Sequence, residues 1–256
     1  MNDLEGKKVR MIGRSTAADL TEVLNWLAQE AAEGNSTFHP NRGLISEGHD
    51  EGDLVVMRDQ GRVVAFSLGA PGVIDIFETR PDCRGRGYGR VLADHCIERA
   101  AAANMAAIEF ECAPDTSLPF WQAMGFEEIP APYGYNPWVM LRVGKRYPLP
   151  AGTPVEVVIR TFDEEVMYDQ GIEPLHEYRP AAVRTENDVV HLLDRVVLHE
   201  PGLPRDHDLA VEIKLGGERL VLDKAKRAKL AAFGVRHDRF RQYFVDRIDP
   251  HGKAED

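Results

Sequence analysis

The sequence has few cysteines and no long apolar run. Its 256 residues include three cysteines, an odd number that shows no C-x-x-C spacing. A reduced, cytoplasmic protein is therefore expected. No uninterrupted apolar run approaches the roughly 18 residues that span a bilayer. The opening residues M-N-D-L-E-G-K-K also lack the apolar region of a signal peptide, so no membrane partner is expected.

Patterns typical of metal sites and hydrolases are also missing. His191, His199 and His207 show no ligand spacing, and Asp206-His207-Asp208 places neighbouring side chains on opposite sides of an extended chain. Nothing near Cys83 or Cys112 marks a nucleophile. We therefore expect no metal.

Charge and composition narrow the class of protein. An apolar fraction of 43% with 29% charged residues is ordinary for a soluble globular chain. The net charge of −11 argues against nucleic acid as the main partner and suits a cationic or amine substrate. The length exceeds one average domain, and 144–154 is rich in proline and glycine, as linkers are. We expect one domain over 1–146 and another over 151–256.

The stretch from Val73 to Arg90 is the most informative part of the chain. Val73 to Arg80 is rich in β-branched and aromatic residues, which predicts a strand ended by Pro81. Three glycines follow, at 85, 87 and 89, and then a helical pattern over 87–103. A strand, a glycine loop and a helix together favour phosphate binding. Neither the Rossmann nor the Walker spacing is present.

Short elements are predicted on both sides of this stretch. A strand over 8–12 precedes a helix with Thr16 as its N-cap, and 35–50 reads as a polar loop with a short helix. Further strands are predicted over 54–58, 63–68, 107–112, 127–129 and 138–143.

The C-terminal part carries its own pattern. A strand is predicted over 155–162, and Gly216-Gly217 joins strands 209–215 and 218–223 in a hairpin. A two-residue turn would set Ile213 opposite Leu220 and Val211 opposite Leu222. Asp223 is then expected to cap a helix ending at Gly234, and the spacing over 240–247 predicts a last helix.

The loop and its flanks carry a family resemblance. Arg84-x-x-Gly87-x-Gly89, preceded by Pro81-Asp82 and followed by Phe120-Trp121-x-x-x-Gly125-Phe126, resembles the acetyl-CoA loop and a later segment of the GNAT superfamily of N-acyltransferases. The resemblance covers roughly residues 8 to 143. It implies an α/β fold with a GNAT-type mixed, mostly antiparallel central sheet flanked by helices. We expect a smaller α+β domain of unknown role, in acceptor recognition or oligomerisation, after it.

The resemblance also implies acetyl-CoA as the acyl donor. Amides from Arg84 to Gly89 would face its pyrophosphate, backbone groups of Phe77 and Thr79 would bond the pantetheine and the acetyl oxygen, and the Trp121 ring would pack on the pantetheine. The predicted cofactor-binding residues are Phe77, Thr79, Arg84, Gly85, Arg86, Gly87, Tyr88, Gly89, Arg90 and Trp121.

The general base is a carboxylate at varying positions on the central strand in this family. One such position here is Val73, which cannot serve. Asp75 lies two residues on, on the same predicted strand face as Val73 and Thr79, and is the first candidate; Glu78 is the second. Glu109 and Glu111 project together from the adjacent strand. They are predicted to bind a cationic substrate or to take the proton through water, unless they form a solvated face.

The general acid is less clear. The usual tyrosine of the family falls at Trp121, which cannot titrate. Tyr133 or Tyr135 is an alternative, or the thiolate leaves unassisted. The asparagine that the family carries after its second strand is also missing, since Pro114-Asp115 stands there.

We therefore predict an acetyl-CoA-dependent N-acetyltransferase that acts on a primary amine, in a small molecule or a protein, by direct attack on the thioester. A non-catalytic acyl-CoA-binding sensor or partner module is one alternative. Another is a C-terminal domain that delivers a nucleic-acid substrate through a basic run formed by Lys224, Lys226, Arg227 and Lys229. The acceptor and a homodimeric assembly stay open.

Overall fold

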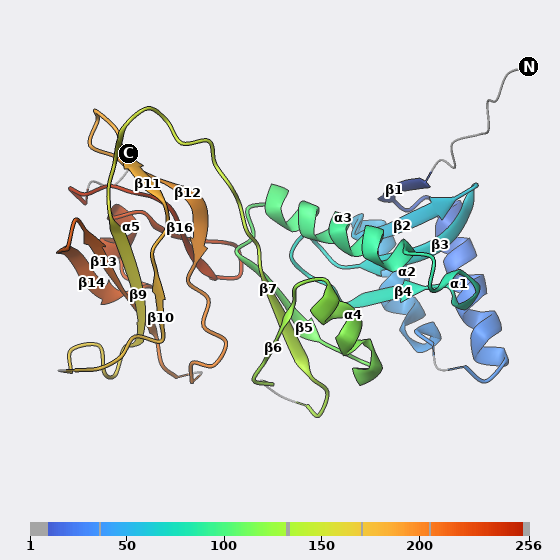
Figure 1. Cartoon of the computed structure of the whole chain (residues 1–256). Coiled ribbons are helices and arrows are strands. Elements are labelled where there is room, and N and C mark those ends of the chain that lie inside the picture. The colour runs from blue at the N-terminus through green and yellow to red at the C-terminus, as the bar shows by residue number, and fades with distance from the viewer. Residues whose placement is uncertain (1–9, 36, 132–133, 170, 205, 253–256) are drawn as a thin grey trace, which may run out of the picture. The chain divides into compact units, whose positions relative to one another are not determined.

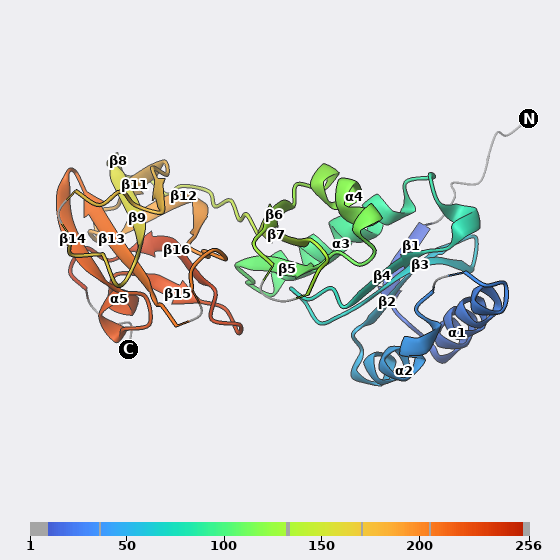
Figure 2. The same cartoon turned by 90° about the horizontal axis from the view of Figure 1, so that it is seen from below.

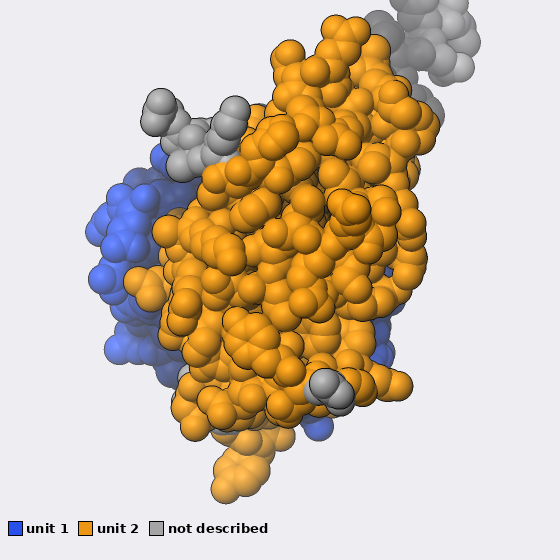
Figure 3. All heavy atoms as spheres, turned by 90° about the vertical axis from the view of Figure 1, so that its left-hand side faces the viewer, with its two compact units in different colours: residues 1–103, 108–127, 136–140 blue, residues 104–107, 128–135, 141–256 orange. Residues whose placement is uncertain are grey.

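The structure, a computed structural model, describes residues 10–35, 37–131, 134–169, 171–204 and 206–252 (Figure 1). The chain divides into two compact units, coloured separately in Figure 3. Residues 1–103, 108–127 and 136–140 make unit 1, and residues 104–107, 128–135 and 141–256 make unit 2. The predicted domains divide the chain once, at the linker 144–154. Unit 2 also contains two short segments that precede this linker.

Unit 1 is built on an antiparallel sheet in the order β1-β2-β3-β4. Its strands are β1 (Arg10–Arg14), β2 (Leu54–Asp59), β3 (Arg62–Leu68) and β4 (Ile76–Thr79). Figure 2 shows α1 (Ala17–Ala32) and α2 (Arg42–Glu51) on one side of this sheet and α3 (Tyr88–Ala102) on the other. A 3-10 turn, η1 (His39–Asn41), precedes α2.

The two faces of this sheet carry separate apolar clusters. Val56 and Phe66 pack with Leu27 of α1, whereas Val55 and Ala65 belong to the cluster of α3. Successive strand residues point to opposite faces, so continuous apolar runs such as that of β2 bury both faces. The sheet is therefore a middle layer between helices.

A second sheet runs in the order β5-β7-β6. It consists of β5 (Ala107–Glu111), β6 (Glu127–Ile129) and β7 (Trp138–Arg142). The 3-10 turn η3 (Asp115–Ser117) and the short helix α4 (Leu118–Ala123) follow β5. The strands predicted in this region are confirmed to within one residue.

Unit 2 holds two further antiparallel sheets, in the orders β10-β9-β13-β14 and β15-β16-β12-β11-β8. Their members are β8 (Thr153–Pro154), β9 (Val157–Asp163), β10 (His176–Tyr178), β11 (Ala182–Arg184), β12 (Val190–Val197), β13 (Leu209–Leu215), β14 (Glu218–Lys224), β15 (Val235–His237) and β16 (Tyr243–Ile248). The helix of this part is α5 (Ala228–Ala232). Ile159, Leu192, Ile213 and Val245 share one core cluster that draws on both sheets.

The mixed α/β class with several antiparallel sheets is confirmed, but the details of the C-terminal half are partly wrong. The predicted hairpin exists, yet Ile213 faces Val221 and Val211 faces Asp223, because the register shifts after Ile213. A bulge places one extra residue in one strand, which a sequence pattern does not reveal.

Both helices predicted after this hairpin need correction. Asp223 lies inside β14, and the helix that follows is five residues long with Arg227 at its N-cap. The predicted last helix is instead strand β16, paired with β12 through Val245 opposite Val196. A short apolar pattern of this kind fits either a helix or a strand, and pairing with β12 makes the segment a strand.

In unit 1 the polar segment 35–50 contains the ten-residue helix α2, longer than predicted, and residue 36 lies outside the described residues. The predicted strand from Val73 is also too long, since the ladder with β3 begins at Ile76. The first strand begins at Arg10 among the described residues.

The predicted start of α1 is confirmed in detail. Thr16 and Asp19 form a capping box, and Arg58 of β2 donates to the Asp19 carboxylate through Nε at 2.7 Å. Burial alone would raise the pKa of Asp19, but the hydrogen bonds from Arg58 and Thr16 lower it to about 2. The Asp19 side chain is 8% exposed, so the Arg58–Asp19 ion pair connects α1 to β2 in a largely buried position.

This lowered pKa predicts an acid-sensitive contribution to stability. The contribution is present above the ordinary aspartate pKa of 3.8 and is lost as the pH falls toward about 2. Between about pH 5 and pH 2, the free energy of unfolding of the wild type should fall by about 2 kcal/mol more than that of Asp19→Asn. Urea unfolding across this range measures the difference, and parallel curves for the two proteins would contradict it.

Unit 2 is organised around one buried guanidinium. The Arg195 side chain is 0% exposed and donates to both carboxylate oxygens of Asp246 at 2.8 Å. Its other contacts include the Asn104 side chain at 3.0 Å and the Phe244 ring, 3.8 Å from the guanidinium carbon. Two residues after Asn104, the Ala106 amide donates to the Asp238 carboxylate at 2.9 Å. These contacts fix residues 104–107, which lead into β5, within unit 2.

Removing this guanidinium should be costly. Arg195→Met leaves a carboxylate without its buried partner, so the free energy of unfolding should fall by about 3–5 kcal/mol. Arg146→Met is the matched control, because it breaks an ion pair with Asp194 whose side chains are 71% and 56% exposed. That variant should lose at most about 1 kcal/mol. Equal losses of unfolding free energy for the two variants, measured by urea unfolding, would contradict the structural role assigned to Arg195.

Candidate functional site

The predicted glycine loop joins β4 to α3. After the 3-10 turn η2 (Pro81–Cys83), Gly85 and Gly87 adopt φ values of +73° and +81°, a region that side chains disfavour. A Cβ atom on either glycine would meet no atom within 4 Å, so the loop is open above both. Gly87 is the N-cap of α3, which has no side-chain cap.

The start of α3 therefore keeps its free donors. Among the described residues, no acceptor is found for the amides of residues 85–90. Arg86 and Arg90 are exposed and form no ion pair with the described part of the chain. Uncapped amides at a helix start carry partial positive charge, and the two guanidinium groups add to it. The loop is suited to an anion with several oxygens, such as a diphosphate.

Tyr88 takes a structural role through its side chain. The side chain is buried, its hydroxyl donates to the Asp59 carboxylate, and the Arg10 guanidinium lies 4.9 Å from the ring centroid. The hydrogen bond to Asp59, followed by burial, raises the pKa of Tyr88. Tyr88 is among the predicted cofactor-binding residues, and its backbone amide is the group that stays available for that contact.

The strand β4 has one free edge. The Arg80 amide donates to the Val64 carbonyl at 3.0 Å, so alternate residues of β4 turn their backbone groups toward β3. Phe77 and Thr79 lie between these positions and direct their backbone N–H and C=O groups the other way. Since β4 ends its sheet and β5 begins the next, no ladder joins the two strands within the described residues.

An aromatic cluster links β4 with β5. The Trp121 ring of α4 lies 5.0 Å from Phe77 of β4 and 4.7 Å from Phe110 of β5, with Phe120 and Phe126 also in contact. Trp121 is 4% exposed, so most of its surface is used in packing. Its predicted contact with a cofactor stays a prediction. The cluster supports the two strands without hydrogen bonds between them.

At Thr79 the free edge is closed by the chain itself. The Thr79 amide donates to Oε1 of Glu78 at 3.1 Å, and Nε of Arg84 donates to the Thr79 carbonyl at 3.1 Å. Nη2 of Arg84 also donates to Oε1 of Glu78 at 2.9 Å. We call these three residues the Thr79 clasp.

The Glu78 carboxylate in this clasp is partly buried. Its side chain is 15% exposed, whereas that of Arg84 is 58% exposed. Burial raises the pKa of Glu78, while the hydrogen bond and charge of Arg84 oppose the rise. The sequence placed Arg84 at the loop entrance but gave no sign that it pairs with Glu78.

Asp75 lies differently from its predicted position. Its amide donates to the Leu68 carbonyl, although the register pairs Leu68 with Ile76. The regular alternation therefore does not extend to Asp75, and the argument that Asp75 shares a face with Val73 and Thr79 was wrong. The side chain is exposed; partial burial and then the charge of Asp53 raise its pKa.

The remaining predicted residues are divided between the units. Glu109 and Glu111 are half-buried on β5, and Glu111 accepts from Nδ2 of Asn136 at 2.6 Å. Tyr135 belongs to unit 2 and its side chain is fully exposed, while Tyr133 lies outside the described residues. The loop, the β4 edge and Glu78 thus lie together in unit 1, and the predicted role of Tyr135 stays a prediction.

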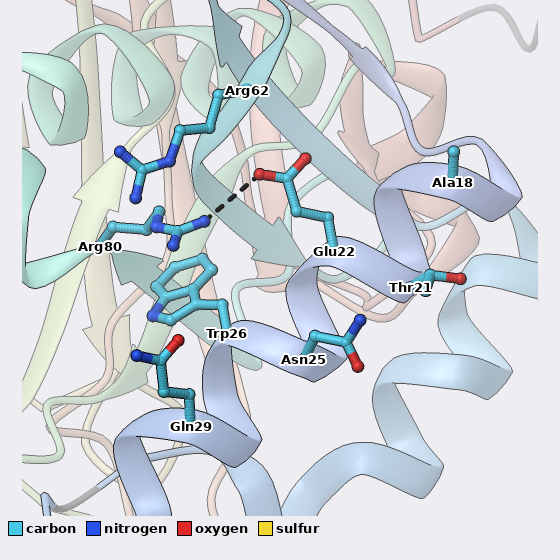
Figure 4. A pocket seen from close by; sticks show the side chains of 8 residues that line it. All are labelled: Ala18, Thr21, Glu22, Asn25, Trp26, Gln29, Arg62 and Arg80. Carbon is cyan, nitrogen blue, oxygen red and sulfur yellow. Dashed lines mark hydrogen bonds and ion pairs between the residues drawn. The ribbon is translucent and has the colours of Figure 1, made fainter. Parts of the chain in front are cut away.

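A pocket of about 530 Å³ lies along α1 (Figure 4). The Arg80 guanidinium sits 5.2 Å from the Trp26 ring and 3.3 Å from the Glu22 carboxylate, and Arg62 pairs with Asp82 at 2.8 Å. The lining residues are Ala18, Thr21, Glu22, Asn25, Trp26, Gln29, Arg62 and Arg80. Sequence reasoning missed this pocket, because no motif connects one face of α1 with Arg62 at the start of β3 and Arg80 just after β4. Its arginines are matched by carboxylates.

Other candidate sites find little support. No group of three or more histidine, cysteine, aspartate or glutamate side chains in the described residues could hold a metal ion. In the basic run, Lys224 pairs with Glu164 and Lys226 with Asp208, which neutralises part of its charge. The helices of the described chain are all too short or too polar to cross a membrane.

Comparison with known proteins gives a family for part of the chain. Residues 20–126 match the model of the acetyltransferase (GNAT) family. No curated protein matches the chain.

Several solved structures are similar to about half of the chain. N-acetylglutamate synthase from Neisseria gonorrhoeae, complexed with coenzyme A and N-acetyl-glutamate, is 12% identical with a TM-score of 0.43. The match covers 54% of this chain and 36% of that one, so the chain spans about a third of that protein. A GNAT acetyltransferase from Staphylococcus aureus is 13% identical, with 53% and 99% covered and a TM-score of 0.43. Ard1 from Thermoplasma volcanium is 22% identical, with 51% and 94% covered and a TM-score of 0.40.

Proposed function

We propose that this protein transfers an acetyl group from acetyl-CoA to a primary amine, and the match of residues 20–126 to the model of the acetyltransferase (GNAT) family supports the proposal. The observation that carries the proposal is the run of amides over residues 85–90, which finds no acceptor among the described residues beside two unpaired arginines. Such a run suits a diphosphate.

The residues of the loop and of β4 fit the coenzyme. The amides of residues 85–90 would hold the diphosphate, with Arg86 and Arg90 contributing charge. The outward backbone groups of Phe77 would pair with the extended arm as an added strand does. Bound there, acetyl-CoA supplies the acetyl group as a thioester.

The transfer forms a C–N bond and breaks the C–S bond, and one proton leaves the nitrogen while another reaches the sulfur. Glu78 is the proposed base, because its carboxylate is the partly buried one on β4. Glu109 and Glu111 would attract a cationic amine. A backbone N–H such as that of Phe77, aimed at the developing negative charge, contributes about 10²–10³ in rate. Trp121 is not expected to donate a proton, so the leaving thiolate takes its proton from solvent and becomes the thiol.

A binding module without catalysis is the second candidate function. The position at which the family resemblance implies an acidic tyrosine is Trp121, which is 4% exposed within an aromatic cluster. Such a protein would bind acetyl-CoA and show no release of free thiol with small amines, proteins or RNA as acceptors. Thiol release that depends on any amine would reject it.

The loop assignment predicts the effect of a carboxylate in front of the amides. Gly87→Glu should weaken binding of CoA at least about 100-fold, because the new charge occupies the anion site and repels the diphosphate. Gly217→Glu is the matched control: Gly217 also has a positive φ, +86°, and open space around its Cβ position, but it lies in the β13–β14 turn. Calorimetric titration with CoA measures both, and equal affinities for the two variants would remove the loop from the site.

The base assignment predicts a loss of turnover without a loss of binding. Glu78→Gln should lower kcat by about 10²–10⁴, the usual contribution of a general base, while CoA still binds. Asp75→Asn, a change of the same kind on an exposed carboxylate, should leave kcat within about threefold. A thiol-release assay with an amine panel tests the pair. Loss of turnover in Asp75→Asn alone would transfer the role to Asp75.

A further inference from the structure

The Thr79 clasp occupies groups that the proposed function needs. We propose that binding of the diphosphate draws the Arg84 guanidinium away from Glu78 and Thr79, which frees the Thr79 carbonyl on the β4 edge and leaves the Glu78 carboxylate without its guanidinium partner. The inference rests on the proposed function, because it requires a diphosphate at the loop. It makes coenzyme binding a condition for an available base.

The first step of the argument is that the clasp blocks the edge. An extended arm that pairs with β4 as an added strand needs free backbone groups at alternate residues. At Thr79 the N–H is bonded to Glu78 and the C=O to Arg84, both at 3.1 Å. The arm therefore cannot pair at Thr79 while Arg84 stays in place.

The second step is that Arg84 can leave. Its side chain is 58% exposed, and an ion pair with one largely exposed partner is weak. Arg84 also directly precedes the run of open amides over residues 85–90. A diphosphate held by those amides offers more charge and more acceptor oxygens than a single carboxylate, and a guanidinium binds such oxygens in pairs.

The third step is the consequence for Glu78. Without Arg84, the neighbours that remain around this carboxylate are the Thr79 amide and, through its charge, Glu30 of α1. Burial and Glu30 both raise the pKa of Glu78, and the opposing contribution of Arg84 is gone. The unpaired carboxylate then accepts a proton more readily, at the time when the acyl donor is present.

The clasp predicts that removing the Glu78 carboxylate strengthens CoA binding. If Glu78 bound CoA directly, its removal would weaken binding instead. Breaking the clasp in advance should help the coenzyme, because Arg84 is already free. In calorimetric titrations of the full chain, Glu78→Gln should bind CoA about threefold to tenfold more tightly than the wild type. Glu78→Asp keeps the negative charge but shortens the side chain by one methylene, and should bind more tightly as well.

Two controls separate the clasp from general electrostatics. Asp82→Asn removes a carboxylate two residues from Arg84 that pairs with Arg62 and not with Arg84, and its CoA affinity should stay within about twofold of the wild type. In an Arg84→Gln background, Glu78→Gln should bring no gain, because the guanidinium to be released is absent. Thermal unfolding confirms that each variant is folded, and Glu78→Asp carries the test if Glu78→Gln is not.

The outcomes distinguish this inference from the proposed function. If the wild type binds CoA but neither Glu78 variant binds it more tightly, the clasp is overturned and the proposed function stands. The same holds if Asp82→Asn gains as much, or if the gain persists without Arg84. Failure of the wild type to bind CoA at all would overturn both.

Discussion

The site depends on the absence of hydrogen bonds between β4 and β5. Each is the last strand of its own sheet, so each keeps one edge without a partner strand among the described residues. An unpaired edge inside a folded unit normally invites pairing with another chain. Here the edge of β4 is supported by aromatic packing through Trp121, with rings of both strands within about 5 Å. Aromatic side chains thus hold the two strands together without using their backbone groups.

The charges of unit 1 are distributed around this edge. The uncapped start of α3, Arg86 and Arg90 make one end positive, while the Glu78 carboxylate lies on β4 and the Asp75 carboxylate just before it. Two contacts between side chains fix this arrangement. Tyr88 anchors the helix start to Asp59, and the Arg58–Asp19 pair fixes α1 on the opposite face. The groups proposed to bind the anion and to accept the proton therefore lie at neighbouring positions of one short segment.

The sequence predicted the parts of the site that depend on local chemistry. The order of strand, glycine loop and helix, and the N-cap at Thr16, follow from residues within a few positions of each other. Contacts that depend on side-chain direction were not predictable. The pairing of Arg84 with Glu78 and the slip of pairing at Asp75 arise because backbone geometry, and not residue spacing, decides where a side chain points.

The C-terminal half shows the same limit at a larger scale. Its strand pattern over 209–223 predicted a hairpin but not the bulge, and 240–247 fits a helix as well as the strand that β12 selects as a partner. Residues 104–107 join unit 2 through Arg195 and Asp238, a relation across about half the chain that no local pattern encodes. Long-range pairing is what a single sequence reveals least.

The central claim is that main-chain amides after β4 hold a diphosphate. A crystal structure of the full chain with CoA tests it most directly. The account predicts diphosphate oxygens within hydrogen-bond distance of the Gly87 and Gly89 amides, with the extended arm lying along Phe77. Electron density for the nucleotide at another place on the chain, with the amides of residues 85–90 facing only solvent, would contradict it.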